Sequence, residues 1–329
     1  MSDTPLYPLR FEPIYQYRLW GGRRLSNWLT APLPDGPVGE AWILSDRDDH
    51  PSQVADGPLK GRTIAQLMHE FPSPLMGTLA GRFSRFPLLL KFLDAREMLS
   101  VQVHPSDAHP ELLPPGETGK TEAWVVLEAG PKSRIYAGLK PGATAEVLRQ
   151  ALTNGNVADD LACFAPKPCD GVFIPAGTVH SLGGNTVVFE VQQNSDVTFR
   201  LYDWNHVDAT TNKPRALQVD QALACIEFGE CAGGLVTPVI EQTTPVLRER
   251  LFHCDQFWLS RLHSKSPFAV GAPSAPVVLV CVEGAGDVEQ GGAAYPVAKG
   301  DVYLLPAAIG AHTFRPRGAV SLLEIEIPA

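Results

Sequence analysis

The segment Leu99–His104 alternates polar and apolar residues along its whole length. Successive side chains of a β-strand point to opposite faces, so Ser100, Gln102 and His104 would share one face. The segment 196–202 has the same alternation and would present Asp196, Thr198, Arg200 and Tyr202 on one face. Strands that each carry one polar and one apolar face are typical of a sandwich or barrel. Here we expect the polar faces to line a cavity.

The rest of the chain also favours a mainly β fold. Its 329 residues include 30 prolines and 29 glycines with only short apolar runs between them, a pattern typical of many turns that join many strands. The run 87–93 is apolar except for Lys91 and predicts a buried strand. Helical spacing of apolar residues predicts three helices, over residues 63–70, 145–154 and 219–228.

Composition and charge exclude several classes of protein. A net charge of −9 spread along the chain disfavours nucleic acid as a partner. The apolar runs are shorter than the ~18–20 residues that span a bilayer, and the N-terminus lacks a signal-peptide pattern. We therefore expect a cytoplasmic protein with no membrane partner. The six cysteines show no C-x-x-C spacing and are expected to be reduced, interior residues.

Three separated segments carry nitrogen and oxygen ligands that suit a divalent metal. Gln102 and His104 come from the alternating strand, Glu122 lies at the start of an apolar run, and His180 ends a turn sequence, Pro-Ala-Gly-Thr-Val-His. A carboxylate is costly to bury in an apolar strand unless a partner such as a metal compensates it. A ligand set without sulfur argues against a structural zinc knot and predicts a catalytic metal site with an open position. A lone buried histidine is more often a hydrogen-bonded core residue, so the prediction depends on all four side chains converging.

The arrangement resembles the cupin double motif, with Gln102 where the first cupin histidine often stands. Beyond that, the chain resembles the class I mannose-6-phosphate isomerases in their shorter bacterial form. Five separated blocks carry this resemblance: 87–95, 99–107, 119–122, 174–180 and 190–204. It runs from about residue 19 to residue 215, and His206 departs from the family's usual loop. After residue 235 it rests only on length and general patterning.

The resemblance implies a mainly β fold of two cupin-type jelly-roll barrels with inserted helices. Residues 1–235 would form a metal-binding catalytic domain with helical insertions, and residues 236–329 a degenerate C-terminal barrel. The proline- and threonine-rich stretch 236–245 is the candidate linker.

A faint internal repeat relates the two halves of the chain. It aligns Glu122 with Val277, a residue that cannot bind a metal, and it leaves His312 one residue out of step with His180. We therefore expect the second barrel to have kept its shape without a metal.

The resemblance also implies a reaction, the zinc-dependent interconversion of mannose 6-phosphate and fructose 6-phosphate through a cis-enediol. It implies one Zn²⁺ per chain, held by Gln102, His104, Glu122 and His180. The family's active-site arginine falls on Arg200, a lysine on Lys120, an acidic residue on Asp196 and a serine near the sugar phosphate on Ser100. The roles stay open, because Arg200 suits either the enediolate charge or the phosphate, and Lys120 or Asp196 suits the general base. Each of these residues also has a purely structural interpretation. Lys120 would be a solvated loop lysine and Asp196 a turn residue, and Arg200 would form a salt bridge to Asp196 or Asp203.

Other functions fit parts of the same pattern. Another sugar-phosphate isomerase would use the same fold, and an Fe²⁺ cupin oxygenase would prefer a site richer in histidine. A non-catalytic sugar-binding cupin that regulates carbohydrate use would keep the barrel but would need no proton-transfer residues. For the isomerase we expect a small hexose phosphate as substrate and a monomer or weak homodimer.

Overall fold

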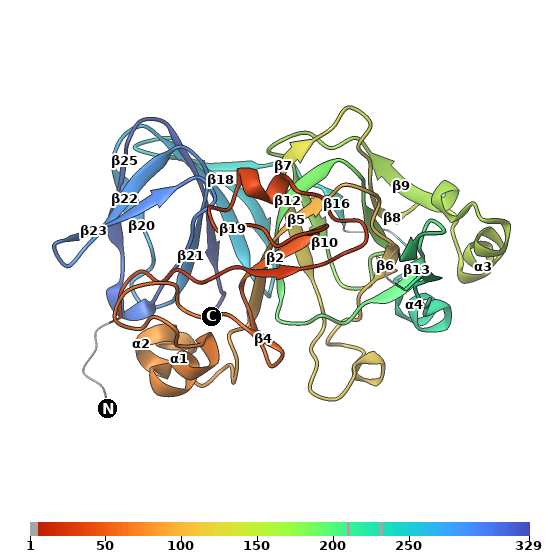
Figure 1. The fold of residues 1–329 in the computed structure, drawn as a ribbon, viewed down its shortest axis with the longest axis horizontal. Coiled ribbons are helices and arrows are strands. Elements are labelled where there is room, and N and C mark those ends of the chain that lie inside the picture. The colour runs from red at the N-terminus through yellow and green to blue at the C-terminus, as the bar shows by residue number, and fades with distance from the viewer. Residues whose placement is uncertain (1–5, 209–210, 230–232) are drawn as a thin grey trace.

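Antiparallel strands dominate the structure, a computed structural model that describes residues 6–208, 211–229 and 233–329. They form two pairs of sheets, one from each half of the chain (Figure 1). The expectation of a mainly β fold is thus confirmed. None of the described helices combines the length and the apolar character that a membrane span requires.

The N-terminal pair consists of a seven-stranded and a five-stranded sheet. The larger sheet has the order β1 (Ile14–Gln16), β2 (Glu40–Leu44), β5 (Leu88–Ala95), β12 (Thr186–Gln193), β7 (Glu122–Ala129), β10 (Gly171–Ile174), β16 (Gly234–Leu235). The smaller has the order β13 (Phe199–Tyr202), β6 (Val101–Val103), β11 (His180–Leu182), β8 (Ile135–Leu139), β9 (Leu161–Phe164). Apolar side chains of both sheets, among them Trp124, Ile135 and Leu182, form one buried cluster between them.

The C-terminal pair consists of a six-stranded and a four-stranded sheet. The larger has the order β17 (Val239–Gln242), β18 (Leu247–His253), β19 (Trp258–Ser264), β26 (Val320–Glu326), β21 (Val277–Glu283), β24 (Val302–Leu305). The smaller has the order β20 (Phe268–Val270), β25 (His312–Pro316), β22 (Ala285–Gln290), β23 (Ala293–Ala298). Strand β17 lies within the stretch that the sequence indicates as a linker.

The two pairs repeat the same strand pairing. In each, eight consecutive strands (β5 to β12 and β19 to β26) make the same set of neighbour contacts in the same order. Glu122 starts β7 opposite the last residue of β10, and Val277 starts β21 opposite the last residue of β24. His180 pairs with Gln102, and His312 pairs with Val270. His312 and His180 are therefore equivalent in the strand pairing. Their one-residue offset in the sequence repeat arises because the connection before β25 is one residue longer than the connection before β11.

Short elements connect these strands. Two small hairpins are β3 (Asp46–Arg47) with β4 (His50–Pro51) and β14 (Val207–Asp208) with β15 (Lys213–Pro214). The helices are α1 (Ile64–Glu70), α2 (Pro72–Met76), α3 (Ala145–Asn154) and α4 (Val219–Cys225). Single 3₁₀ turns are η1 (Arg24–Asn27), η2 (Gly77–Leu79), η3 (Pro110–Leu112), η4 (Val157–Asp160) and η5 (Ala307–Ile309).

The three predicted helices are present. A capping box at Thr63 begins α1, and Gly155 ends α3 in the left-handed conformation that favours glycine. Helix α4 ends three residues earlier than predicted, because Ile226 is extended. Helix α2 was not predicted, since its five residues include two prolines and lack a periodic pattern.

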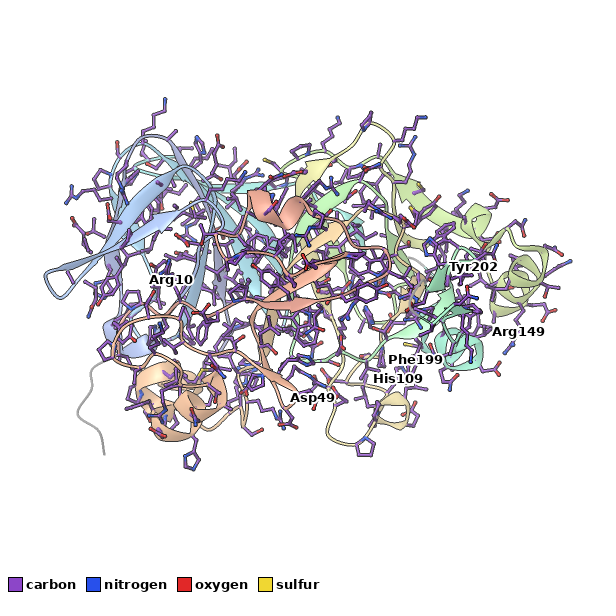
Figure 2. The ribbon with its side chains drawn as sticks, in the orientation of Figure 1. Arg10, Asp49, His109, Arg149, Phe199 and Tyr202 are labelled. Carbon is purple, nitrogen blue, oxygen red and sulfur yellow. The ribbon has the colours of Figure 1, made fainter. Side chains whose placement is uncertain are left out.

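One large apolar cluster joins the two halves of the chain. It combines one face of the seven-stranded sheet, including Phe92 and Phe189, with one face of the six-stranded sheet, including Val278 and Leu323. The opposite face of the seven-stranded sheet is turned toward the five-stranded sheet. On the outer side of the five-stranded sheet, β13 packs with α4, and Figure 2 shows Phe199 and Tyr202 in this region.

The cysteines only partly match the expectation of interior thiols. All five described cysteines are free, and Cys225 and Cys281 are buried, but Cys163 and Cys169 are exposed. Those two lie at an edge strand and a turn, where few neighbours cover them. Cys231 lies outside the described residues.

Candidate metal centre and active site

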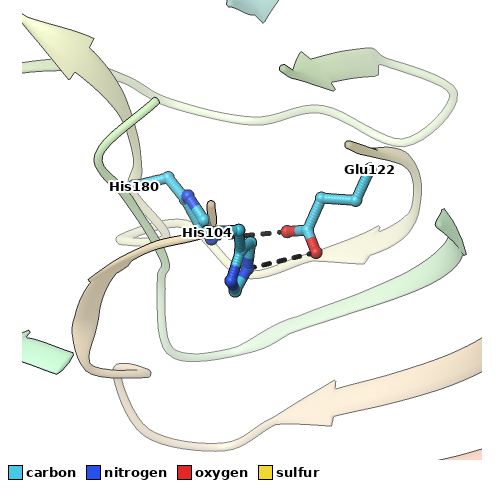
Figure 3. Close-up of side chains that lie close together, drawn as sticks. All are labelled: His104, Glu122 and His180. Carbon is cyan, nitrogen blue, oxygen red and sulfur yellow. Dashed lines mark ion pairs between the residues drawn. The ribbon is translucent and has the colours of Figure 1, made fainter. Parts of the chain in front are cut away.

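Three buried side chains converge inside the N-terminal sheet pair. His104 follows β6, Glu122 starts β7 and His180 starts β11, and their ligand atoms all lie within 4.8 Å of one another. The two imidazole Nε2 atoms lie 3.4 Å and 3.3 Å from the Glu122 carboxylate oxygens, as the dashed lines in Figure 3 show. Three of the four predicted ligands therefore form one compact group.

Backbone carbonyls orient both imidazole rings. The Nδ1 of His104 lies 2.9 Å from the Val197 carbonyl oxygen, and the Nδ1 of His180 lies 2.8 Å from that of Thr178. A carbonyl only accepts hydrogen bonds, so each ring carries its proton on Nδ1 and points the Nε2 lone pair at the group. Metal-binding histidines are typically held in this way.

The electrostatics favour a deprotonated ligand set. Burial, aided by the nearby Lys120 ammonium, lowers the pKa of His104 to about 3, and burial also lowers the pKa of His180. Burial alone would raise the pKa of Glu122, but Lys120 and His104 outweigh it and hold that pKa well below its ordinary value. His104 Nε2 and Glu122 Oε1 are buried without a hydrogen-bond partner. A divalent cation would satisfy both atoms, so the residues fit a metal.

Gln102 lies beside this group. Its side-chain Nε2 is 3.2 Å from His180 Nε2, and its Oε1 accepts a 3.2 Å hydrogen bond from the Ser100 hydroxyl. The two ends of an amide have nearly the same shape. A half-turn of the amide would thus present the oxygen, which is the ligand atom, to the group.

A cavity of about 480 Å³ opens beside the group of His104, Glu122 and His180, which we call the metal group. All the remaining predicted site residues line it: Ser100, Gln102, Lys120, Asp196 and Arg200. The polar faces of β6 and of the segment leading into β13 therefore do line a cavity, as the alternation predicts. Tyr202 is the exception, because a register shift after Arg200 separates it from the polar face and it packs against Trp204 instead.

The structure contradicts the purely structural interpretations of Lys120 and Arg200. Lys120 is 4% exposed, and its Nζ lies 3.1 Å from a Glu122 oxygen, so it is not a solvated loop residue. Arg200 makes no ion pair with any described carboxylate, since Asp203 is taken by Arg215 at 2.8 Å. Asp196 is exposed at the cavity wall.

Six further charged residues of the cavity wall escaped prediction from the sequence: Arg18, Glu40, Lys91, Glu190, Asp208 and Arg215. The first four form one network. Lys91 Nζ lies 3.2 Å from Glu190 and 3.8 Å from Glu40, and Glu40 also accepts a 2.8 Å hydrogen bond from Arg18. Two tryptophan indoles donate to the same carboxylates, Trp124 to Glu190 and Trp42 to Glu40.

The environment shifts the pKa values of these groups. Burial would raise the pKa of Glu40, but Arg18 and Lys91 reverse the effect and lower it to about 2. Burial raises the pKa of Glu190. The pKa of Lys91 is raised as well, because its acidic neighbours outweigh the lowering effect of burial. A signal in the sequence was available, because Lys91 in β5 and Glu190 in β12 each interrupt an apolar run, on the face opposite to the large core.

Comparisons with known proteins indicate one family. Residues 9–119 match the family model described as phosphomannose isomerase type I, catalytic domain. The chain is 34% identical to mannose-6-phosphate isomerase ManA of Bacillus subtilis, covering 92% of this chain and 94% of the relative. It is 32% identical to the mannose-6-phosphate isomerase of Streptococcus mutans, covering 93% and 95%.

Solved structures show the same fold. The crystal structure of the Bacillus subtilis mannose 6-phosphate isomerase superposes with a TM-score of 0.89 at 28% identity, covering 97% of this chain and 99% of that one. A putative mannosephosphate isomerase from Archaeoglobus fulgidus, at 21% identity, shares the fold with a TM-score of 0.78 over the full length of both chains. Because the sequence likeness to the curated relatives spans nearly the whole chain, this protein belongs to the type I phosphomannose isomerase family.

Proposed function

We propose that this chain interconverts mannose 6-phosphate and fructose 6-phosphate. The observation that carries the proposal is the buried group of His104, Glu122 and His180, which contacts Gln102 and Lys120 in the wall of a charged cavity. The cations suit an anionic sugar phosphate, and the metal-binding group suits its hydroxyl and carbonyl oxygens. Membership of the family points to the same reaction.

The group would hold one Zn²⁺ per chain, with Gln102 as the fourth protein ligand. Imidazole nitrogens and carboxylate oxygens are ligands that zinc prefers, and the absence of thiolates fits a catalytic site that keeps an open position. When bound, the cation would polarise a sugar oxygen as a Lewis acid. The neutral imidazoles and the ionised Glu122 are already in the protonation states that binding requires.

The remaining residues would bind the sugar and move a proton between C1 and C2. The reaction passes through a cis-enediol with developing negative charge on oxygen, which the guanidinium of Arg200 would stabilise without titrating. Lys120, beside Glu122, or Asp196, at the cavity wall, would act as the general base. Ser100 would contribute a hydroxyl to substrate binding.

The repeated strand pairing supports an architecture of two cupin-type jelly-roll barrels. We place residues 1–235 in the catalytic domain and residues 236–329 in a degenerate, metal-free barrel. Strands β16 and β17 lie on either side of this boundary and pair with different sheets. Size-exclusion chromatography with light scattering would test the expected monomer or weak homodimer.

A coupled assay with mannose 6-phosphate, run beside elemental analysis, tests the function. The purified protein should turn over the substrate and contain about one zinc per chain, and chelation should abolish turnover until zinc is restored. Turnover that survives exhaustive metal removal would refute the metal-dependent mechanism. Binding of hexose phosphates without any turnover would instead support a regulatory sugar-binding protein.

Arg200→Ala tests the assignment of the arginine. We expect kcat/KM to fall by about a hundredfold or more, because a charge-matched donor is removed from the substrate, while metal content stays the same. Loss of zinc in this variant would show that the arginine supports the metal group instead.

A further inference from the structure

The end of strand β12 carries a buried glutamine that the proposed mechanism does not use. Gln192 is completely buried and lies directly opposite Glu122 of β7 in the strand pairing. Residues directly opposite one another on neighbouring strands share a face of the sheet. The Gln192 side chain is therefore on the face that carries the Glu122 carboxylate of the metal group.

Two backbone carbonyls fix the orientation of the Gln192 carboxamide. Its Nε2 donates to the Gln193 carbonyl at 3.0 Å and to the Ser195 carbonyl at 2.5 Å. Because a carbonyl only accepts hydrogen bonds, the flipped amide would set its own oxygen against two acceptors. The Oε1 atom is buried and has no hydrogen-bond partner among the described residues. An unpaired buried oxygen costs free energy, so stabilisation of the fold alone does not explain a glutamine at this position.

The turn that Gln192 holds, residues 193–197, carries two groups of the site. The Val197 carbonyl accepts the 2.9 Å hydrogen bond from His104 Nδ1 that orients this imidazole. Asp196 lies at the cavity wall, and within the described part of the chain its carboxylate has no hydrogen-bond or ion-pair partner. The position of that carboxylate therefore depends on the backbone of the turn.

Few other contacts fix this backbone. Asn194 anchors the start of the turn, since its amide and its side chain donate to two backbone carbonyls at 2.9 Å and 3.0 Å. Beyond it, Gln192 and His104 are the described side chains outside the turn that hydrogen-bond to the backbone of residues 195–197. The glutamine is thus the support of this segment on the side of the metal group.

We propose that Gln192 is a positioning residue, which acts through this turn to hold the Val197 carbonyl against His104 and to hold Asp196 at the cavity wall. The inference rests on the proposed function, because it assigns a support to the metal ligand and to the candidate base of the same site. Without the carboxamide, the Ser195 carbonyl loses its described donor and the peptide that leads into Asp196 is free to rotate. The imidazole would then lose the partner that keeps its proton on Nδ1.

The test compares Gln192→Met with the matched control Ser133→Ala. Methionine keeps the length and the approximate volume of glutamine but donates no hydrogen bond. Ser133 is also buried, and its hydroxyl lies 2.9 Å and 3.1 Å from the backbone carbonyls of Gly184 and Asn185. These residues precede the opposite end of β12, about 20 Å along the strand from Gln192. Both variants remove a buried donor to backbone carbonyls, so both should lower the Tm by a similar few degrees.

Zinc affinity and the steady-state constants separate positioning from a role in folding. Competition with a chromogenic chelator should show zinc binding about tenfold weaker in Q192M, because partners of metal-binding histidines typically contribute ten- to a hundredfold, and within twofold of the wild type in S133A. At saturating zinc, Q192M should lower kcat about tenfold and change KM less than threefold, because it displaces Asp196 and leaves the substrate-binding groups in place. The control should keep both constants within twofold.

The His104 imidazole provides a readout that needs no turnover. In the purified wild type labelled with ¹⁵N-histidine, the buried Nδ1 proton that is bonded to Val197 should give an NMR signal that exchanges slowly with water. Its absence in His104→Gln assigns the signal. We expect this signal to be lost to fast exchange in Q192M and to be unchanged in S133A.

The outcomes distinguish this inference from the proposed function. A His104 proton that exchanges as slowly in Q192M as in the wild type would overturn the inference, as would equal losses of zinc affinity in Q192M and S133A. A kcat of Q192M within twofold of the wild type would remove Asp196 from the groups that Gln192 positions. If the wild type shows no turnover, the proposed function fails and the imidazole signal still decides: its loss in Q192M supports the inference, and its persistence refutes it.

Discussion

The N-terminal and C-terminal sheet pairs have the same strand pairing, but their interiors differ in polarity. Between the N-terminal sheets, the metal group and a network of buried charges lie beside the apolar cluster. Between the C-terminal sheets, the interior is mainly an apolar cluster that includes Val277, Leu279 and Phe314, together with one ion pair between Arg248 and the buried Glu324. Within the described residues, the histidine, cysteine and acidic side chains of the C-terminal pair form no cluster that could hold a metal.

Equivalent positions show where the interiors diverge. Glu122 and Val277 occupy the same place in the pairing and are both 1% exposed. Val270 takes the place of Gln102, and only His312 keeps the residue type of its counterpart, His180. The backbone arrangement therefore accepts either interior. The polar one requires that each buried charge finds a partner, because uncompensated charges are costly to bury.

The largest effect should come from removing the central metal ligand. On the proposed function, Glu122→Gln should lower zinc content well below one per chain and reduce turnover at least about a thousandfold, since the bound metal would supply several kcal/mol of transition-state stabilisation. His312→Gln, at the position equivalent to a ligand in the C-terminal pair, should leave metal content unchanged and turnover within twofold. Elemental analysis and the coupled assay measure both. Zinc loss in the His312 variant would break the comparison, because it would make the second interior a metal site.

The reverse exchange should be nearly as disruptive. Val277→Glu places a carboxylate in an interior where Arg248 is already paired with the buried Glu324, at 2.5 Å, and we expect the free energy of unfolding to fall by about 3–5 kcal/mol. Val277→Thr, which keeps the shape and adds only a hydroxyl, should cost about 1–3 kcal/mol. Urea unfolding followed by fluorescence measures the difference. If Val277→Glu costs no more than Val277→Thr, this interior admits charge and the contrast between the two sheet pairs fails.

The smallest effect concerns the charge network and depends on pH. The folded-state pKa of Glu40 is about 2 against an ordinary value of 4.5, so its ionised form stabilises the fold by about 3 kcal/mol above pH 4.5. This contribution disappears as the pH falls from 4.5 through 2. The difference in unfolding free energy between wild type and Glu40→Gln should therefore be constant above pH 5 and shrink below it.

The exposed Glu241, which pairs with Arg250 at 2.6 Å, provides the control for this measurement. Glu241→Gln should change the unfolding free energy by less than about 0.5 kcal/mol at every pH. Acid release of the metal affects wild type and variants alike and cancels in the difference. A Glu40 variant whose deficit stays the same down to pH 2 would show that the network does not hold its pKa low.

Local sequence pattern identified the candidate ligands and the polar wall. Alternation in Leu99–His104 correctly placed Ser100, Gln102 and His104 on one face, and the cost of burying Glu122 in an apolar strand correctly indicated a partner. Helical spacing of apolar residues located α1 and α3. Each of these features depends on residues within a few positions of one another, and such short-range rules can be read along the chain.

Only the tertiary structure decided which charges meet. Lys91 interrupts an apolar run, and nothing near it in the sequence indicates that Glu190 on a neighbouring strand and Glu40 would surround it. The same holds for Arg215, whose place beside Arg200 depends on how the chain after β15 docks on β13. Such contacts depend on strand register, and a shift by one residue would turn every side chain of a strand to the other face. The sequence by itself determined which side chains are available inside the first sheet pair, and the packing of distant strands determined their partners.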